Sequence, residues 1–206
     1  MAMSNKQLPV WPHHNVGGCL GLDLVNTVCW RGRAQPEDRL PDIPALLSWS
    51  LAAGALEKAE ARELADEAAR HPRLAAQALA RARALREAGH RVLSAIALRR
   101  PAPEDDLRAL HAAQAEALAA SQWRLEGGRY RPSLRAWPSL DKPALRCALS
   151  FCELLSSADY GRIRRCGDAE CGWMFLDTSK GGRRQWCIAE LCGNKNRLRR
   201  FHAARG

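Results

Sequence analysis

Long apolar stretches are missing from this sequence of 206 residues. Nowhere do 18 apolar residues follow one another, so we expect no membrane-spanning helix. The first 14 residues contain no apolar run of signal-peptide length either. We therefore expect a soluble protein of the reducing cytoplasm. This expectation covers a protein associated with the nucleoid.

Signatures of catalysis are also missing. The sequence has no Ser–His–Asp or Cys–His pattern of nucleophilic catalysis, no phosphate-binding P-loop and no H-E-x-x-H metalloprotease motif. Repeats and low-complexity tails are absent as well, and the length corresponds to one or two domains. These absences argue against an enzyme and leave a regulator or an interaction module.

Acidic residues are scarce at the C-terminal end of the chain. From residue 161 to residue 206 there are 11 Lys and Arg against 4 Asp and Glu, a net charge of +7. The first 160 residues carry only +3 of the total charge of +10. A basic excess confined to one segment indicates a polyanionic partner such as nucleic acid.

The same segment is rich in cysteine. Cys166 with Cys171, and Cys187 with Cys192, form two C-x4-C pairs separated by 15 residues. Four thiolates brought together suit one tetrahedral Zn²⁺, and such a closed site is structural because no coordination position stays open for a substrate. Ordinary buried thiols and two disulfides are the alternatives, although disulfides require an oxidising compartment.

A zinc ion with four thiolates carries a formal charge of −2, which nearby cations must offset. Some of the basic residues in this segment therefore have two alternative roles. They either stabilise the metal centre or contact a partner, and the candidates for the first role are Arg164, Arg165, Arg183 and Lys195.

This C-terminal segment resembles the CGNR-type zinc finger of a bacterial family of stress-induced transcription regulators. The residues that carry the resemblance are Cys166, Cys171, Gly172, Trp173, residues 175–179, Arg183, Arg184, Trp186, Cys187, Cys192, Gly193 and Asn194. Lys195 departs from the pattern, because the family has Arg there and a lysine lacks the planar fork of a guanidinium. The preceding part resembles, more weakly, the ABATE-type domain that accompanies this finger.

We expect residues 161–206 to form a finger that resembles a treble clef. A strand over residues 173–177 would turn at Gly181 and Gly182 and return over residues 184–186, before a helix from Asn194 to about Ala204. Trp173 and Trp186 would cover the metal site or simply pack in a core.

The resemblance implies DNA binding, and the last helix suits it. Leu198 and Phe201 would anchor this helix inward and leave its cations exposed to a major groove or a phosphate backbone. The candidate nucleic-acid-binding residues are Arg183, Arg184, Lys195, Arg197, Arg199 and Arg200. A zinc-stabilised module that binds protein or RNA, without sequence-specific DNA binding, is the alternative function.

Residues 1–160 are expected to form a mostly helical, ABATE-like domain that senses a signal or dimerises. Helical periodicity and caps predict helices near residues 20–28, 42–53, 57–70, 72–98, 104–120 and 141–157, with Gly89 interrupting the apolar face of the longest. A Gly-Gly turn predicts a hairpin over residues 123–130, with Glu126 opposite Arg129 and Leu125 opposite Tyr130. The fold class is therefore mainly α with a small β-hairpin (α+β), followed by the zinc finger that packs on this body.

Three polar residues interrupt the first apolar helix. Asp23, Asn26 and Thr27 lie together on one side of it. They either connect the helix to neighbouring loops through hydrogen bonds to the backbone or line a pocket for a small-molecule effector. The partners that we expect are DNA, a second copy of the chain and such an effector.

Overall fold

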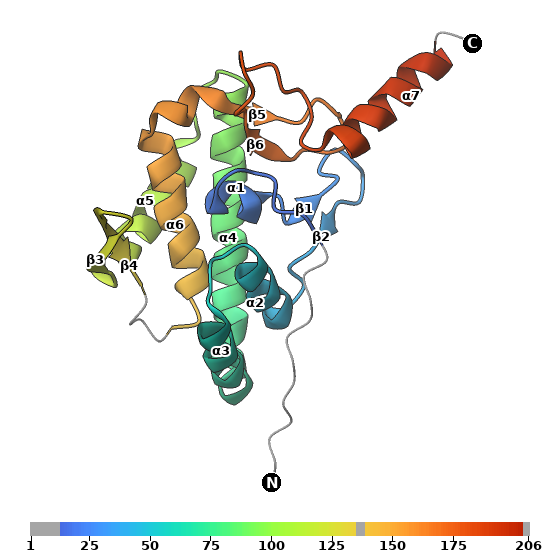
Figure 1. Ribbon diagram of the computed structural model, residues 1–206. Coiled ribbons are helices and arrows are strands. Elements are labelled where there is room, and N and C mark those ends of the chain that lie inside the picture. Colours follow the sequence, from blue (N-terminus) through green and yellow to red (C-terminus); the bar gives the residue numbers. More distant parts are fainter. Residues whose placement is uncertain (1–12, 135–138, 204–206) are drawn as a thin grey trace.

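The structure, a computed structural model, describes residues 13–134 and 139–203 (Figure 1). The helices are α1 (Leu20–Val25), α2 (Ile43–Ala52), α3 (Lys58–Arg70), α4 (Pro72–Ala97), α5 (Glu104–Ala119), α6 (Lys142–Ser156) and α7 (Asn194–Ala203), with single turns at η1 (Ala158–Arg162) and η2 (Ala189–Gly193). The antiparallel strand pairs are β1 (Val28–Cys29) with β2 (Glu37–Asp38), β3 (Gln122–Glu126) with β4 (Arg129–Ser133), and β5 (Ile163–Arg165) with β6 (Met174–Leu176).

This arrangement confirms the predicted fold class. Helices make up the body, and strands occur only as small antiparallel pairs among the described residues. The finger follows at the C-terminal end, where α7 extends away from the body in Figure 1. Across the described ranges, no helix combines the length and the apolar character that crossing a bilayer requires.

Local signals place the helices of the body. Asp42 caps α2 by accepting a hydrogen bond from the Ala45 N–H at 2.8 Å, and Gly54, with a φ of +73°, follows its last turn. Glu57 and Glu60 form a capping box at the start of α3. Glu60 also accepts a hydrogen bond at 2.9 Å from Lys142 Nζ, which joins α3 to α6.

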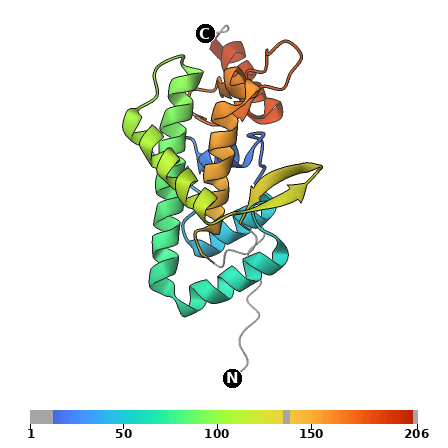
Figure 2. The same cartoon turned by 90° about the vertical axis from the view of Figure 1, so that its left-hand side faces the viewer.

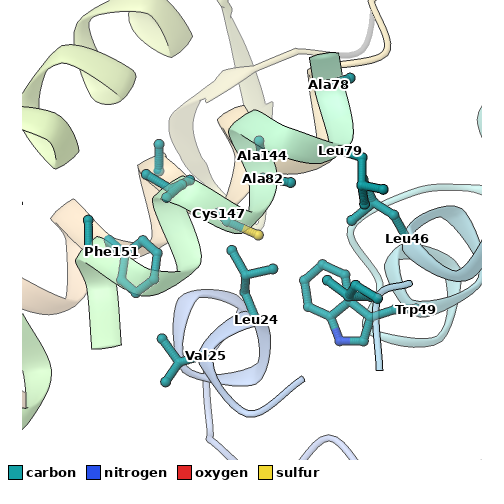
Figure 3. Close-up of a cluster of buried hydrophobic side chains, with 14 of the residues drawn as sticks. Leu24, Val25, Leu46, Trp49, Ala78, Leu79, Ala82, Ala144, Cys147 and Phe151 are labelled. Atoms are coloured by element: carbon teal, nitrogen blue, oxygen red, sulfur yellow. The ribbon is translucent and has the colours of Figure 1, made fainter. Parts of the chain in front are cut away.

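The core lies where α1, α2 and α6 pack against α4. Figure 3 shows Leu24, Trp49 and Cys147 meeting there, and all three are buried. The ring of Phe151 occupies the junction of α1, α4 and α6, because both neighbouring helices present a glycine to it. A β-carbon on Gly21 would lie 2.8 Å from Cδ1 of this ring, and one on Gly89 would lie 2.4 Å from Cζ.

The long helix is confirmed, and Gly89, which interrupts its apolar face in the sequence, lies on the buried side of that helix. The helix α4 runs unbroken from Pro72 to Ala97, and the missing side chain at Gly89 makes room for Phe151. The first helix differs from its prediction. It ends at Val25 and not at the predicted residue 28. The Asn26 side chain hydrogen-bonds to the backbone of Met174 in β6, and Val28 begins β1.

The β3–β4 hairpin has the predicted register. Glu126 pairs with Arg129 and Leu125 with Tyr130, around glycines with φ of +59° and +76°. Figure 2 shows the hairpin extending away from the helices. Its apolar side chains face solvent: Trp123 is 70% exposed, Leu125 63% and Tyr130 69%.

We predict that Gly89→Ala lowers the free energy of unfolding by about 1–3 kcal/mol, because the added methyl group overlaps the buried Phe151 ring. Helix propensity alone predicts the opposite sign, a gain of about 1 kcal/mol. Urea denaturation measures the difference. Gly161→Ala is the control, since nothing lies within 4 Å of its β-carbon position. A Gly89→Ala protein as stable as wild type would contradict this packing.

Candidate metal centre and its basic helix

The four cysteines of the C-terminal segment converge on one point. All four are buried, and their sulfurs lie within 4.8 Å of one another. The Sγ atoms of Cys171 and Cys187 are 3.6 Å apart, and those of Cys187 and Cys192 are 3.7 Å apart. Tetrahedral zinc with Zn–S bonds of about 2.3 Å requires sulfurs about 3.8 Å apart. The cluster therefore fits one zinc ion.

The first two cysteines lie in a turn over residues 166–173, called the knuckle below. It lies between β5 and β6, whose register pairs Ile163 with Leu176. The Cys166 N–H donates to the Trp173 carbonyl at 2.8 Å and closes the turn. Gly172, with a φ of +74°, lets the chain leave the knuckle in a left-handed conformation.

The predicted return strand over residues 184–186 is wrong. β6 pairs with β5, which precedes the knuckle, and residues 183–186 are not in a strand. Buried Asp177 explains the change. Its carboxylate accepts from the Ser179 N–H at 2.9 Å and from the Arg184 N–H at 3.1 Å, so it folds the intervening residues into a loop.

The second pair of cysteines lies at the start of the last helix. The Cys192 N–H donates to the Ile188 carbonyl at 3.0 Å within the turn η2, and α7 follows directly. Trp186 and Trp173 both pack against the cysteine cluster, as predicted. Trp173 also donates its indole N–H to the Val28 carbonyl at 3.1 Å, which joins the finger to the body.

Without a metal, at least one thiol of this cluster holds its proton firmly. Burial, followed by the negative charge of Cys171 and Cys166, raises the pKa of the Cys192 thiol well above its usual range. A bound Zn²⁺ reverses this preference, since thiolates are its ligands and their protons leave when it binds.

Acidic residues of the knuckle hold the basic helix in place. Lys195 Nζ lies 3.2 Å from Asp168 and 2.9 Å from Glu170, and Arg199 forms ion pairs with the same two carboxylates. Arg33 of the body adds a third cation, 2.8 Å from Glu170. Hydrogen bonds from Lys195, Arg33 and Arg199 lower the pKa of Glu170 to about 2. The acidic partners and Arg33 were missed in the sequence, where only the cations drew attention.

Arg184 has an internal role too. Its Nε donates to the Trp186 carbonyl at 3.0 Å, and its Nη2 donates to the carbonyl of Cys187 at 2.5 Å. The guanidinium lies over the Phe175 ring, 4.3 Å from the centroid. Arg184 therefore fixes the chain that carries a zinc-site cysteine.

The three remaining candidates are free of such contacts. Arg183, Arg197 and Arg200 are exposed, and none of their guanidinium groups forms an ion pair with a described residue. Arg197 and Arg200 lie on α7, away from the knuckle acids that hold Lys195 and Arg199.

The expectation that Leu198 and Phe201 anchor the last helix is wrong. They are 59% and 50% exposed, and α7 has no buried residue. The helix is held instead by the ion pairs of Lys195 and Arg199. Leu191, at 59% exposure, adds to the outward apolar side chains. The predicted helix end at residue 204 lies outside the described residues.

Asp23, Asn26 and Thr27 have partners inside the protein. Asp23 accepts from the Gly17 N–H at 2.7 Å, and burial raises its pKa to about 6. The Asn26 amide donates to the Met174 carbonyl and accepts from its N–H, both at 2.8 Å. Thr27 donates to the Leu24 carbonyl at 2.7 Å. All of these are hydrogen bonds to backbone groups, as expected if the three residues connect the first helix to neighbouring segments. Asn26 in particular joins α1 to β6.

Comparisons with known proteins agree with this geometry. The family model ABATE, described as "Putative stress-induced transcription regulator", matches residues 18–158. The model of the CGNR zinc finger matches residues 162–205. Neither is an enzyme family. No curated protein matches the chain at a significant level. The finger match and the clustered sulfurs together support one structural zinc ion.

We predict one zinc per chain by elemental analysis, and loss of the finger's fold when a strong chelator removes it. The metal supplies folding free energy on the order of 10 kcal/mol or more to a segment too small for an adequate core. Lowering the pH should weaken zinc binding, because protons compete for the thiolates. Near-ultraviolet circular dichroism and tryptophan emission follow the transition. Metal-free protein whose four thiols react freely in the folded state would contradict the assignment.

Proposed function

The chain belongs to the ABATE family and ends in a CGNR zinc finger, and we propose that it is a zinc-binding transcription regulator whose finger binds DNA. The observation that carries the proposal is the pair Arg197 and Arg200, exposed and unneutralised on a helix that extends from the body. Phosphates are the natural partners of such a pair. On this view the regulator acts in the cytoplasm, at the nucleoid.

The proposal divides the basic residues into two groups. Arg183, Arg197 and Arg200 contact phosphates, since nothing in the described part of the chain neutralises them. Lys195 and Arg199 set the direction of α7 through Asp168 and Glu170, and Arg184 holds the metal loop. The second group thus serves binding indirectly, by presenting the first.

We further propose that residues 1–160 act as a dimerising domain and residues 161–206 as the DNA-binding domain. The apolar side of the β3–β4 hairpin supports this, because Trp123, Leu125 and Tyr130 are exposed on a two-stranded ribbon that is marginal alone. A second copy of the chain covers this side. Pairing also doubles the small number of free cations per complex. An effector of this domain stays a prediction.

One observation favours the alternative function, a module that binds protein. Leu191, Leu198 and Phe201 are exposed on η2 and α7, and apolar side chains of this kind contribute little to phosphate contacts. The complete absence of salt-dependent binding to any duplex would favour this second reading, with RNA as the other partner to examine.

We predict that duplex binding weakens steeply with salt, with a log–log slope of roughly −3 to −6 for three phosphate contacts in one copy or two. Arg197→Gln should weaken binding to all sequences alike and reduce the steepness by about 1 per copy, because one phosphate contact is lost. Fluorescence anisotropy of a labelled duplex across a salt series measures both.

Arg73→Gln is the matched control, since it removes the same charge from an exposed position on α4. It should leave affinity and slope close to those of the wild type. Equal losses in Arg73→Gln and Arg197→Gln would mean that only net charge matters, and would count against a binding surface on α7.

We predict a concentration-dependent dimer in analytical ultracentrifugation. Leu125→Glu should shift it to monomer, because a carboxylate would be buried in the apolar contact. Leu107→Glu, at a 41% exposed position on α5, is the control. A wild-type chain that stays monomeric at high concentration would contradict dimerisation. A dimer that Leu125→Glu leaves intact would place the dimer contact outside the hairpin.

A further inference from the structure

A groove runs between the loop before Cys187 and the last helix. Its volume is about 450 Å³, which lies within the usual size of small-molecule sites. The lining residues are Gln185, Trp186, Asn196, Arg199, Arg200 and Ala203. An aromatic ring, two carboxamides and two guanidinium groups are thus gathered within one small depression.

The indole of Trp186 is held firmly at this groove. A β-carbon on Gly193 would lie 3.1 Å from its Cδ1, and one on Gly167 would lie 3.0 Å from its Cζ3. Both positions are glycine, so the backbone closes tightly on the ring. The Gly167 N–H also donates to the Gln185 carbonyl at 2.9 Å, which fixes the adjacent backbone. A ring held this way loses little entropy when a planar ligand stacks on it.

Several polar groups of the groove have donors or acceptors that no described residue uses. Asn196 donates from Nδ2 to the Cys192 carbonyl at 2.9 Å, which orients its amide and leaves the oxygen as an acceptor. Gln185 is exposed, and its side chain forms no hydrogen bond with the described residues. Arg199 is neutralised by Asp168 and Glu170, whereas Arg200 has no acidic partner in the described chain. One cation is therefore free to take an anion.

We propose that this groove binds a nucleotide, with its base stacked on Trp186, its base edge at Gln185 and Asn196, and its phosphate on Arg200. Carboxamides present a donor beside an acceptor, as base edges do. Stacking on an aromatic ring suits any base, because every base has a π-face. A base inside an intact duplex has both faces and its pairing edge occupied, so the site takes unpaired bases.

Two sources supply this chemistry: a free nucleotide, or an unpaired base within a DNA strand. A second hollow of about 580 Å³ begins at the same Gln185 and Trp186 and continues past Arg183 and Ile188. The two hollows share Gln185 and Trp186 as lining residues, and this adjacency favours a strand. With the strand as source, the inference deepens the proposed function and rests on it; with the free nucleotide it stands alone.

The test uses the zinc-loaded full chain and three ligands: thymidine monophosphate, an oligothymidylate of about 12 nucleotides, and the matching duplex. Tryptophan emission reports stacking, and anisotropy of labelled strands reports affinity. We expect quenching by the single strand, by the monophosphate, or by both, and the pattern identifies the source. Trp186→Phe should abolish the quenching, and Gln185→Ala should weaken binding about two- to tenfold.

Arg73→Gln, distant from the groove, should behave as the wild type in every arm. Circular dichroism and zinc content of Trp186→Phe establish that its finger is folded. Unchanged emission with both the single strand and the monophosphate overturns the nucleotide site, as does wild-type affinity in both groove variants. Quenching that persists without any duplex binding supports the site and removes the proposed duplex function, so the two failures are distinguishable.

Discussion

Four cysteine sulfurs drawn to one point are the constraint on which the C-terminal part of the molecule depends. The segment is too short to bury an adequate core, and the sulfur cluster joins the knuckle to the start of α7, beside the ion pairs of Lys195 and Arg199. The cluster places Trp186 against Gly193 and sets the point from which α7 leaves the finger. The groove, the basic residues and the direction of the helix all follow from that placement.

Charge compensation around the cluster divides a basic segment into two groups. The negative charges of Asp168 and Glu170 hold Lys195 and Arg199, and these ion pairs orient α7 where apolar anchoring was expected. The net charge of +7 already includes these two carboxylates, so it is the count of 11 Lys and Arg that overstates the free cations a partner meets. Lys195 stands where the resemblance expects Arg, and its compact ammonium reaches two carboxylates and lies 4.6 Å from the centre of the Trp30 ring.

The sequence predicted what local signals determine. The Asp42 cap, the Pro72 start of α4 and the Gly-Gly turn of the hairpin each act within a few residues, and the structure has all three. The cysteine spacing located the metal centre for the same reason. Three-residue strands carry no periodicity, so the pairing of β5 with β6 could not be found. Nor could the partners of Asn26, since Met174 is distant in the chain.

The boundary between the two family segments is not a boundary in the packing. Ile163 and Met174 of the finger's strands belong to the same apolar cluster as Leu24 and Phe151 of the body, and Asn26 pairs with the backbone of Met174 as a neighbouring strand would. A gene fusion that cuts after residue 160 would strip buried side chains from the helices and leave the knuckle strands uncovered. The two segments therefore cannot be exchanged between proteins as independent units. A displacement of one segment is transmitted to the other through the core that they share.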